Sequence, residues 1–388
     1  MVKREDKDKW RFSDAGWGGD WLDLIIKGER LRPFQWRFGY FSHGPCLSEV
    51  NYKGWYGKEK YVSLESSVST LRTDDYARTF FNIRYDFNTD THTDLSFFTL
   101  GTTEAIHTPT IAWGNKEGLI EERDLDRQKP NHIYIEQQSF DGAGPFWFGF
   151  PKQELPKTKG GKGWRAIVIR SFEASFGGVR YRQPTFSVIN LRRNRQNLID
   201  PNASFVLRPP LEVSRISQGD WVSVDISIIA LPRKADDYYG PNTRFHQHMA
   251  ENPDSWKTIH REAAENVRSV DIHSGGEVVS TYPIIVSAID QEMIKVAIQG
   301  GLGAVPLQFN GLLSRHYMLF RCTDEGEISI DGEQAVHGND FYQVEYHHCQ
   351  IEKNDSSEVA GYYCITFNII LDEIDSSIWV LRRVGDDL

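Results

Sequence analysis

The sequence has no long hydrophobic run and no excess of basic residues. No stretch of about 18 apolar residues occurs, so we expect no membrane-spanning segment. The formal net charge is −10, and this acidic balance argues against nucleic acid and anionic membrane surfaces as partners. Residues 1–9 are charged and lack the apolar core of a signal peptide. The localisation stays open: cytoplasmic, or secreted or periplasmic if the chain is a mature or excised piece.

Cysteines are few, and motifs that specify a reaction are missing. The cysteines are Cys46, Cys322, Cys349 and Cys364. None has the CxxC spacing of a zinc knuckle, and one disulfide among the three C-terminal ones is compatible with the sequence. The chain has no nucleophile elbow, no phosphate-binding loop and no dinucleotide fingerprint. The sequence therefore predicts a fold and a ligand class better than a catalytic step.

We expect no metal at the functional site and no cofactor. The residues His246-Gln247-His248 would place two imidazoles on one face if they formed a strand, but a third zinc ligand is not evident. The pair His347-His348 also offers two imidazoles as metal ligands, and a third ligand is not evident for it either. Asp236-Asp237 offers oxygen ligands for a structural Ca²⁺.

Aromatic residues are abundant, at 13% of the chain with 11 Trp. Two of the Trp have glycine neighbours, in Gly16-Trp17-Gly18-Gly19 and Gly54-Trp55-Tyr56-Gly57. Exposed rings of this kind can stack on the apolar faces of sugars. The alternative is that these rings close the ends of a β-sandwich. We take Trp17, Trp55 and Trp113, with Arg72 and Asn115, as candidate substrate-binding residues.

Short strands separated by turns dominate the sequence, which predicts an all-β, mainly antiparallel protein. Residues 77–87 alternate polar and apolar side chains, and we expect them to form a long antiparallel hairpin with 95–100. Other candidate strands before the helix are 22–26, 61–68, 133–136, 147–150, 165–172 and 221–231. Candidate strands after it are 278–287, 294–298, 316–322, 341–346, 362–371 and 378–382.

One linking helix is expected between two β-rich regions. Asn252-Pro253-Asp254 offers capping residues, and Trp256, Ile259, Ala263, Val267 and Val270 then follow at helical spacing. We predict a flexible arm at 1–20, a large β-sandwich at 21–250, the linker helix at 251–272, and a small β-sandwich or jelly roll at 273–388.

Three short stretches carry a family resemblance. Residues 72–78 with 83–86 (RTDDYAR and IRYD), 98–101 (FTLG) and 337–342 (HGNDFY) resemble the β-sandwiches of carbohydrate-active enzymes. The nearest class is the supersandwich, or galactose-mutarotase-like, fold of polysaccharide lyases and some glycoside hydrolases. The resemblance implies a polysaccharide or oligosaccharide as the ligand. Lyases of this class often carry a helical toroid, and the single helix expected in this chain departs from that pattern.

Tyr76 and Arg78, together with His43 and His107, are the candidate catalytic residues. An Arg can neutralise the carboxylate of a uronic acid and acidify the neighbouring proton, while a Tyr or His transfers that proton. The sequence thus favours a lyase that acts by β-elimination. An ion-paired strand rim with an ordinary Tyr is the alternative interpretation.

Other functions stay open at this point. Glu136 and Asp141 are candidates for the carboxylate pair of a glycoside hydrolase, whose separation a sequence cannot give. A non-catalytic carbohydrate-binding or assembly module would need only a shallow aromatic face. A structural β protein that forms homo-oligomers is a third possibility.

Overall fold

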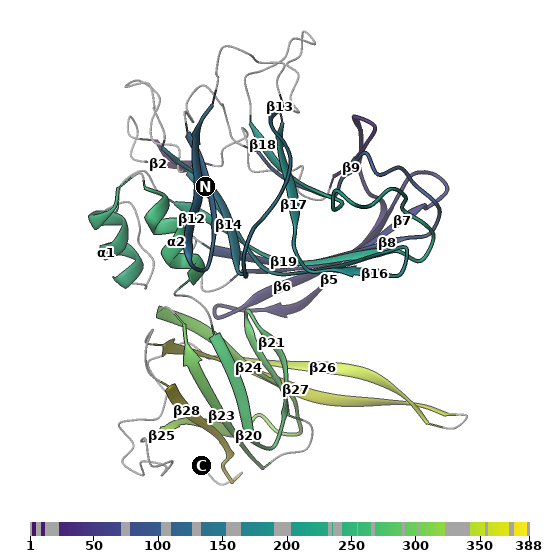
Figure 1. The fold of residues 1–388 in the computed structure, drawn as a ribbon. Coiled ribbons are helices and arrows are strands. Elements are labelled where there is room, and N and C mark those ends of the chain that lie inside the picture. The colour runs from purple at the N-terminus through teal and green to yellow at the C-terminus, as the bar shows by residue number, and fades with distance from the viewer. Residues whose placement is uncertain are drawn as a thin grey trace.

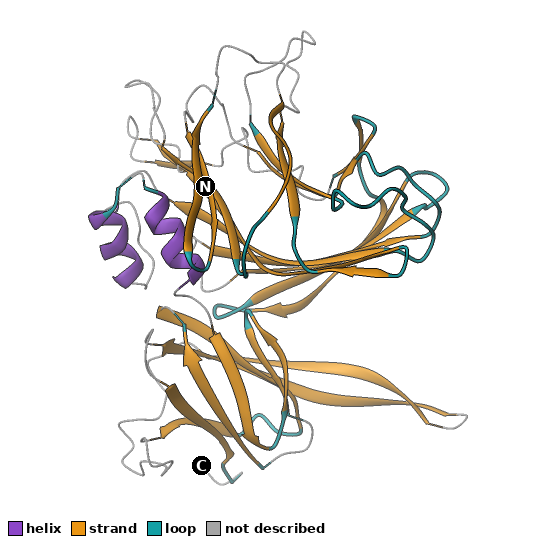
Figure 2. Ribbon diagram, in the orientation of Figure 1, coloured by secondary structure: helices purple, strands orange, loops and turns teal. Residues whose placement is uncertain are grey.

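A computed structural model gives the fold of the chain. It describes residues 2–4, 9–11, 23–70, 78–101, 110–125, 133–152, 164–189, 203–231, 235, 243–253, 255–264, 268–288, 292–301, 303–322, 342–353, 356–371 and 376–385. Strands form most of this part of the chain, and the predicted all-β class is confirmed (Figure 2).

The largest element is a twisted ten-stranded antiparallel sheet (Figure 1). Its strands are, in spatial order, β12 (Gly118–Asp124), β11 (Thr110–Asn115), β14 (Phe146–Lys152), β15 (Trp164–Phe176), β19 (Trp221–Leu231), β8 (Arg78–Phe87), β7 (Val62–Thr70), β6 (Ser48–Tyr56) and β5 (Phe34–His43), with β16 (Val179–Tyr181) beside β15.

A second layer covers one face of this sheet. It is a four-stranded sheet of β10 (Phe98–Gly101), β18 (Ser204–Arg208), β17 (Thr185–Ile189) and β13 (Ile133–Ser139). Smaller pieces are β4 (Glu29–Leu31), β3 (Leu24–Ile26) and β9 (Leu95–Ser96) in one sheet, and β1 (Val2–Arg4) with β2 (Lys9–Arg11) in another.

Alternation of side chains along the strands decides which face of the large sheet is buried. On β8, Ile83, Tyr85 and Phe87 point into the core between the two layers. The residues between them, Asn82, Arg84 and Asp86, therefore lie on the opposite face, which we call the outer face. Burial of one face and exposure of the other is what the 77–87 alternation predicts.

The hairpin predicted for 77–87 and 95–100 is wrong. β8 pairs with β7 and β19, whereas β10 pairs with β18 in the opposing sheet. The chain crosses between the layers after residue 87, and β9 pairs with β3 on the way. Both segments have strand character, but their partners come from distant parts of the chain.

Two helices replace the single linking helix expected at 251–272. They are α1 (Thr243–Glu251) and α2 (Trp256–Ala264), and residues 268–274 form a strand instead. Ile259 and Ala263 of α2 are buried against the outer face, together with Trp147. The apolar spacing therefore marks a true helix face, but it ends at Ala263.

The C-terminal unit is a smaller β-sandwich with a core of its own. One sheet contains β20 (Arg268–Ser274), β23 (Met293–Gly300), β28 (Ser376–Arg383) and β25 (Tyr317–Cys322). The other contains β21 (Glu277–Thr281), β22 (Ile284–Ser287), β24 (Gly303–Leu312), β27 (Ser356–Leu371) and β26 (Tyr342–Lys353). The β26–β27 hairpin extends away from this sandwich (Figure 1).

Two further findings concern membranes and cysteines. In the described ranges, no helix is long and apolar enough to cross a membrane. Cys46, Cys322 and Cys364 are buried and lie outside disulfides, and burial raises the pKa of the Cys364 thiol to about 12.

Candidate functional site

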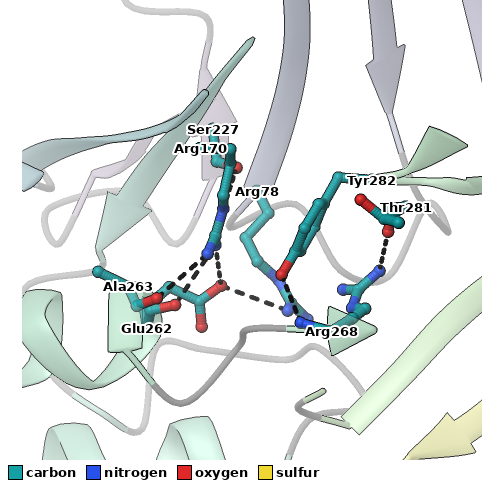
Figure 3. A network of polar contacts seen from close by, with 8 residues as sticks. All are labelled: Arg78, Arg170, Ser227, Glu262, Ala263, Arg268, Thr281 and Tyr282. Carbon is teal, nitrogen blue, oxygen red and sulfur yellow. Dashed lines mark hydrogen bonds and ion pairs between the residues drawn. The ribbon is translucent and has the colours of Figure 1, made fainter. Parts of the chain in front are cut away.

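Arg78 lies in a buried polar network rather than in an open cleft (Figure 3). Its Nη1 atom is 3.5 Å from Oε1 of Glu262 on α2, and the two side chains are 1% and 0% exposed. Arg170 of β15 lies 3.9 Å from the same carboxylate oxygen. It also donates hydrogen bonds to Ser227 Oγ and to the carbonyl of Ala263. The predicted role of Arg78 at a substrate carboxylate is corrected, because α2 covers this guanidinium.

Tyr282 extends the network into the C-terminal unit (Figure 3). The guanidinium carbons of Arg170 and Arg268 lie 4.6 and 4.5 Å from the centre of its ring. Its hydroxyl accepts a hydrogen bond of 2.8 Å from the backbone N–H of Arg268. Burial lowers the pKa of Arg170, and it lowers that of Arg268 to about 10. The network thus ties the large sheet to α2 and to the C-terminal sandwich.

His43 ends β5 and has an exposed side chain. Its backbone N–H donates a 2.7 Å hydrogen bond to Oε1 of Glu345 on β26. His43 lies on a cross-strand row with Ser48, Thr70 and Thr79. Three interstrand spacings, roughly 14 Å, therefore separate it from the start of β8. His43 and Arg78 share one end of the sheet but do not meet.

The described substrate-binding candidates have three different environments. Trp113 is fully buried between the layers, against Phe148 and Phe186, so the prediction that its ring rims a cleft is corrected. Asn115 shapes the turn after β11, where its Oδ1 accepts from the N–H of Glu117 and its Nδ2 donates to the carbonyl of Asp141. Trp55 is half-buried on β6, with Nζ of Lys60 4.7 Å from its ring centre.

The other candidates give little support to hydrolysis or metal binding. Glu136 is exposed on β13, and Asp141 is exposed in the turn that follows that strand. His246 and His248 lie on α1 rather than on a strand, where residues two apart do not share a face. No group of three or more potential metal ligands occurs among the residues that the structure describes. Trp17, Arg72, Tyr76, His107 and Asp236-Asp237 lie outside the described residues.

The end of the outer face that α2 leaves uncovered, around Trp221, carries a group of residues of which only Trp55 is predicted from the sequence. One cross-strand row there consists of Trp55, Ser63, Asp86, Trp221, Ser175 and Arg180, on strands β6, β7, β8, β19, β15 and β16 in turn. Both Trp are half-buried. Three interstrand spacings place them roughly 14 Å apart.

Arginines frame Trp221. The guanidinium carbons of Arg84 and Arg180 lie 4.5 and 4.6 Å from the centre of its ring. Arg84 forms an ion pair with Asp86 at 2.8 Å, and Arg180 forms one with Glu173 at 3.3 Å. These four charged side chains are 38 to 57% exposed.

Beyond the row of Arg84, Ser223 and Glu173, a third row adds uncharged and acidic hydrogen-bonding groups. Asn82 of β8 donates to Asp225 of β19, and Ser171 of β15 donates to the other oxygen of that carboxylate at 2.5 Å. Together the three rows hold hydroxyl, amide, carboxylate and guanidinium groups beside two indole rings. The signal in the sequence is the polar half of the alternation in 77–87 and 221–231, which marks one shared face.

Comparisons with known proteins give weak likenesses. No protein-family model matches the chain, and neither does any curated protein sequence. One similar solved structure is the galactosidase domain of alpha-galactosidase-sucrose kinase AgaSK, with a TM-score of 0.32 and 9% identity, covering 59% of this chain. The chain spans only 31% of the length of that protein.

Two other solved structures are similar at the same level. Galactose 1-epimerase from Lactobacillus acidophilus NCFM has a TM-score of 0.28 and 7% identity over 55% of this chain and 78% of its own. Heparan sulfate lyase HepC from Pedobacter heparinus has a TM-score of 0.26 and 8% identity over 72% of this chain and 28% of its own. These neighbours are of the carbohydrate-active class that the sequence resembles. Likenesses with TM-scores this low do not assign a function to the chain.

Proposed function

We propose that this protein binds a carbohydrate polymer on the uncovered end of the outer face. The observation that carries the proposal is the row that joins Trp55 and Trp221 across four neighbouring strands. Between the two indoles lie Ser63 and Asp86, whose short side chains leave the rings as the largest groups on the row. A sheet face with two aromatic rings on one cross-strand row suits an extended chain of sugar units.

The chemistry of the face matches a ligand rich in hydroxyl groups. Indole rings stack on the apolar faces of sugars, and neighbouring polar groups orient the ligand. Asn82, Asp225 and Ser171 supply both donors and acceptors. Because these groups are near the surface, they can replace their hydrogen bonds to one another with hydrogen bonds to sugar hydroxyls.

Three ion pairs lie on this face, which favours a neutral glycan over a polyanion. Arg84 pairs with Asp86, Arg180 with Glu173, and Lys53 with Glu65. Exposed pairs of this kind contribute little to stability, typically about 0–1 kcal/mol. They leave no strong field of one sign to attract a polyanion.

Elimination chemistry is a second proposal that the described geometry does not favour. It needs a cation that reaches the substrate carboxylate, and the guanidinium of Arg78 is buried against Glu262. Tyr76 and His107 are outside the described residues. A lyase would release unsaturated products that absorb ultraviolet light, and an assay on acidic polysaccharides separates this activity from binding alone.

Affinity electrophoresis tests the binding proposal. Native gels would contain one soluble polysaccharide each: β-glucan, xylan, galactomannan, galactan or polygalacturonate. We expect at least one neutral polysaccharide to retard the protein, and Trp221→Ala and Trp55→Ala each to weaken that binding about tenfold, equivalent to about 1.4 kcal/mol.

The matched control is Val179→Ala. Val179 is exposed beside Arg180, and its side chain points to the opposite face of the sheet. Circular dichroism would confirm that each variant is folded. Unchanged retardation of both Trp variants, or no retardation of the wild type in any gel, would contradict the proposal.

A further inference from the structure

The C-terminal sandwich exposes a second aromatic surface, on β26. This strand is the edge of its five-stranded sheet. Tyr342, Val344 and Tyr346 alternate along it and are 45, 39 and 54% exposed. We call these three residues the β26 strip. Their partners on β27 are Phe367, Ile365 and Tyr363, so the strip continues the core face of the sheet beyond the edge of the opposing sheet.

The rings of the strip rest on the neighbouring strand. The Tyr342 ring stacks on Phe367 with 6.3 Å between centroids and an interplanar angle of 20°. The Tyr346 ring contacts Tyr363 at 4.9 Å and crosses over Gly361. A Cβ atom added at Gly361 would lie 1.7 Å from the Tyr346 hydroxyl oxygen and 2.2 Å from Cζ. The φ angle of Gly361 is not positive, so a side chain there would not strain the backbone. It would instead displace the Tyr346 ring.

We infer that the β26 strip is a second carbohydrate-binding surface, and this inference rests on the proposed function. Tyr rings supported from below present a flat apolar face with a hydroxyl at the rim, which suits stacking on a sugar with a hydrogen bond at its edge. The strip spans four residue steps, roughly 13 Å. A stable protein partner would need about 800 Å² and 20–30 residues on each side, far more than three side chains offer.

The two surfaces are separate in space. The alternate residues of β26 pack against the first sandwich: Gln343 accepts hydrogen bonds from the N–H groups of Cys46 and Leu47, and Glu345 accepts one from His43. His347 stacks on Phe41 with 5.1 Å between centroids. The strip therefore points away from this junction. A polymer chain that reaches both surfaces would bind more tightly than a ligand that reaches only one of them. Binding at the first surface raises the effective concentration of the chain at the second.

Tyr346→Ala in the full chain tests this inference, in the polysaccharide gel that retards the wild type most. We expect Tyr346→Ala to weaken polymer binding about tenfold. The dissociation constant for a hexasaccharide cut from the same polymer, measured at the Trp221 surface by tryptophan fluorescence, would stay within twofold. Gly361→Val, which displaces the Tyr346 ring while keeping Tyr346, would weaken binding in the same way.

The control is Ile370→Ala on β27. Ile370 is 69% exposed, and its side chain lies on the other face of the same sheet. Wild-type retardation of Tyr346→Ala, in a gel where Trp221→Ala is impaired, would overturn the β26 strip and leave the first surface standing. Loss of retardation by Ile370→Ala as well would also overturn it. A wild type that no gel retards would overturn both surfaces together.

Discussion

Arg78 and Trp221 show how the environment of a residue decides its role. The sequence marks Arg78 as a candidate because charged residues surround it, but α2, more than 170 positions later, closes over its guanidinium. Trp221 has no glycine-rich neighbourhood, yet its side chain lies at the surface. Exposure depends on which face of a strand a residue occupies and on what covers that face. The second condition cannot be read from neighbouring residues.

The buried pair of Arg78 and Glu262 predicts a large loss of stability on substitution. Arg78→Ala should lower the free energy of unfolding by about 3–5 kcal/mol, because it leaves a buried carboxylate without this cation. Urea denaturation followed by fluorescence would measure the change.

Lys53→Ala is the comparison for this prediction. Lys53 pairs with Glu65 at 2.7 Å, but the two side chains are 61 and 56% exposed. Lys53→Ala should lower the free energy of unfolding by less than about 1 kcal/mol. Equal effects of the two substitutions would show that Arg78 is not buried in solution.

Strands are the scale at which the sequence is most informative. The alternation in 77–87 and 221–231 marks each strand and its two faces, and the structure pairs them along their length. The partners of a strand are harder to predict, as 95–100 shows: a short polar turn suggests a hairpin, whereas the chain crosses to the other layer. Long-range pairing depends on packing between distant segments, which local patterns do not contain.

The turn after β5 joins the first sandwich to the second through hydrogen bonds to Gln343 on β26. A Cβ atom at Gly44 would lie 2.3 Å from Oε1 of Gln343, the atom that accepts from the N–H groups of Cys46 and Leu47. Gly44→Ala should displace this amide. Hydrogen exchange at Cys46 and Leu47 should then accelerate about fivefold, because the loss of one hydrogen bond costs about 1 kcal/mol of stability.

Gly39→Ala provides the control on the same strand, because nothing lies within 4 Å of a Cβ atom added there. Mass spectrometry of peptides that cover residues 42–50 would follow the exchange. We call the hydrogen bonds from Cys46 and Leu47 to Gln343 the Gln343 clamp. If hydrogen exchange in Gly44→Ala is as slow as in Gly39→Ala, the clamp is refuted.

The whole molecule consists of two β-sandwiches with separate cores, joined through Tyr282 and through the Gln343 clamp. The C-terminal unit and α2 cover part of the outer face and leave the end with Trp55 and Trp221 uncovered. The two-sandwich architecture is visible in the sequence as strand-rich regions on either side of a helix. The binding surface is not, because its residues come from six strands that are distant in the sequence.

Fluorine NMR of protein labelled with 5-fluorotryptophan tests the central claim most directly. The resonances of Trp55, Trp113, Trp147 and Trp221 would be assigned by single substitutions and followed during titration with a hexasaccharide from the polymer that retards the protein. We predict that the Trp55 and Trp221 signals shift, while those of the buried Trp113 and Trp147 stay in place. Binding that leaves the Trp55 and Trp221 signals unmoved would contradict the account.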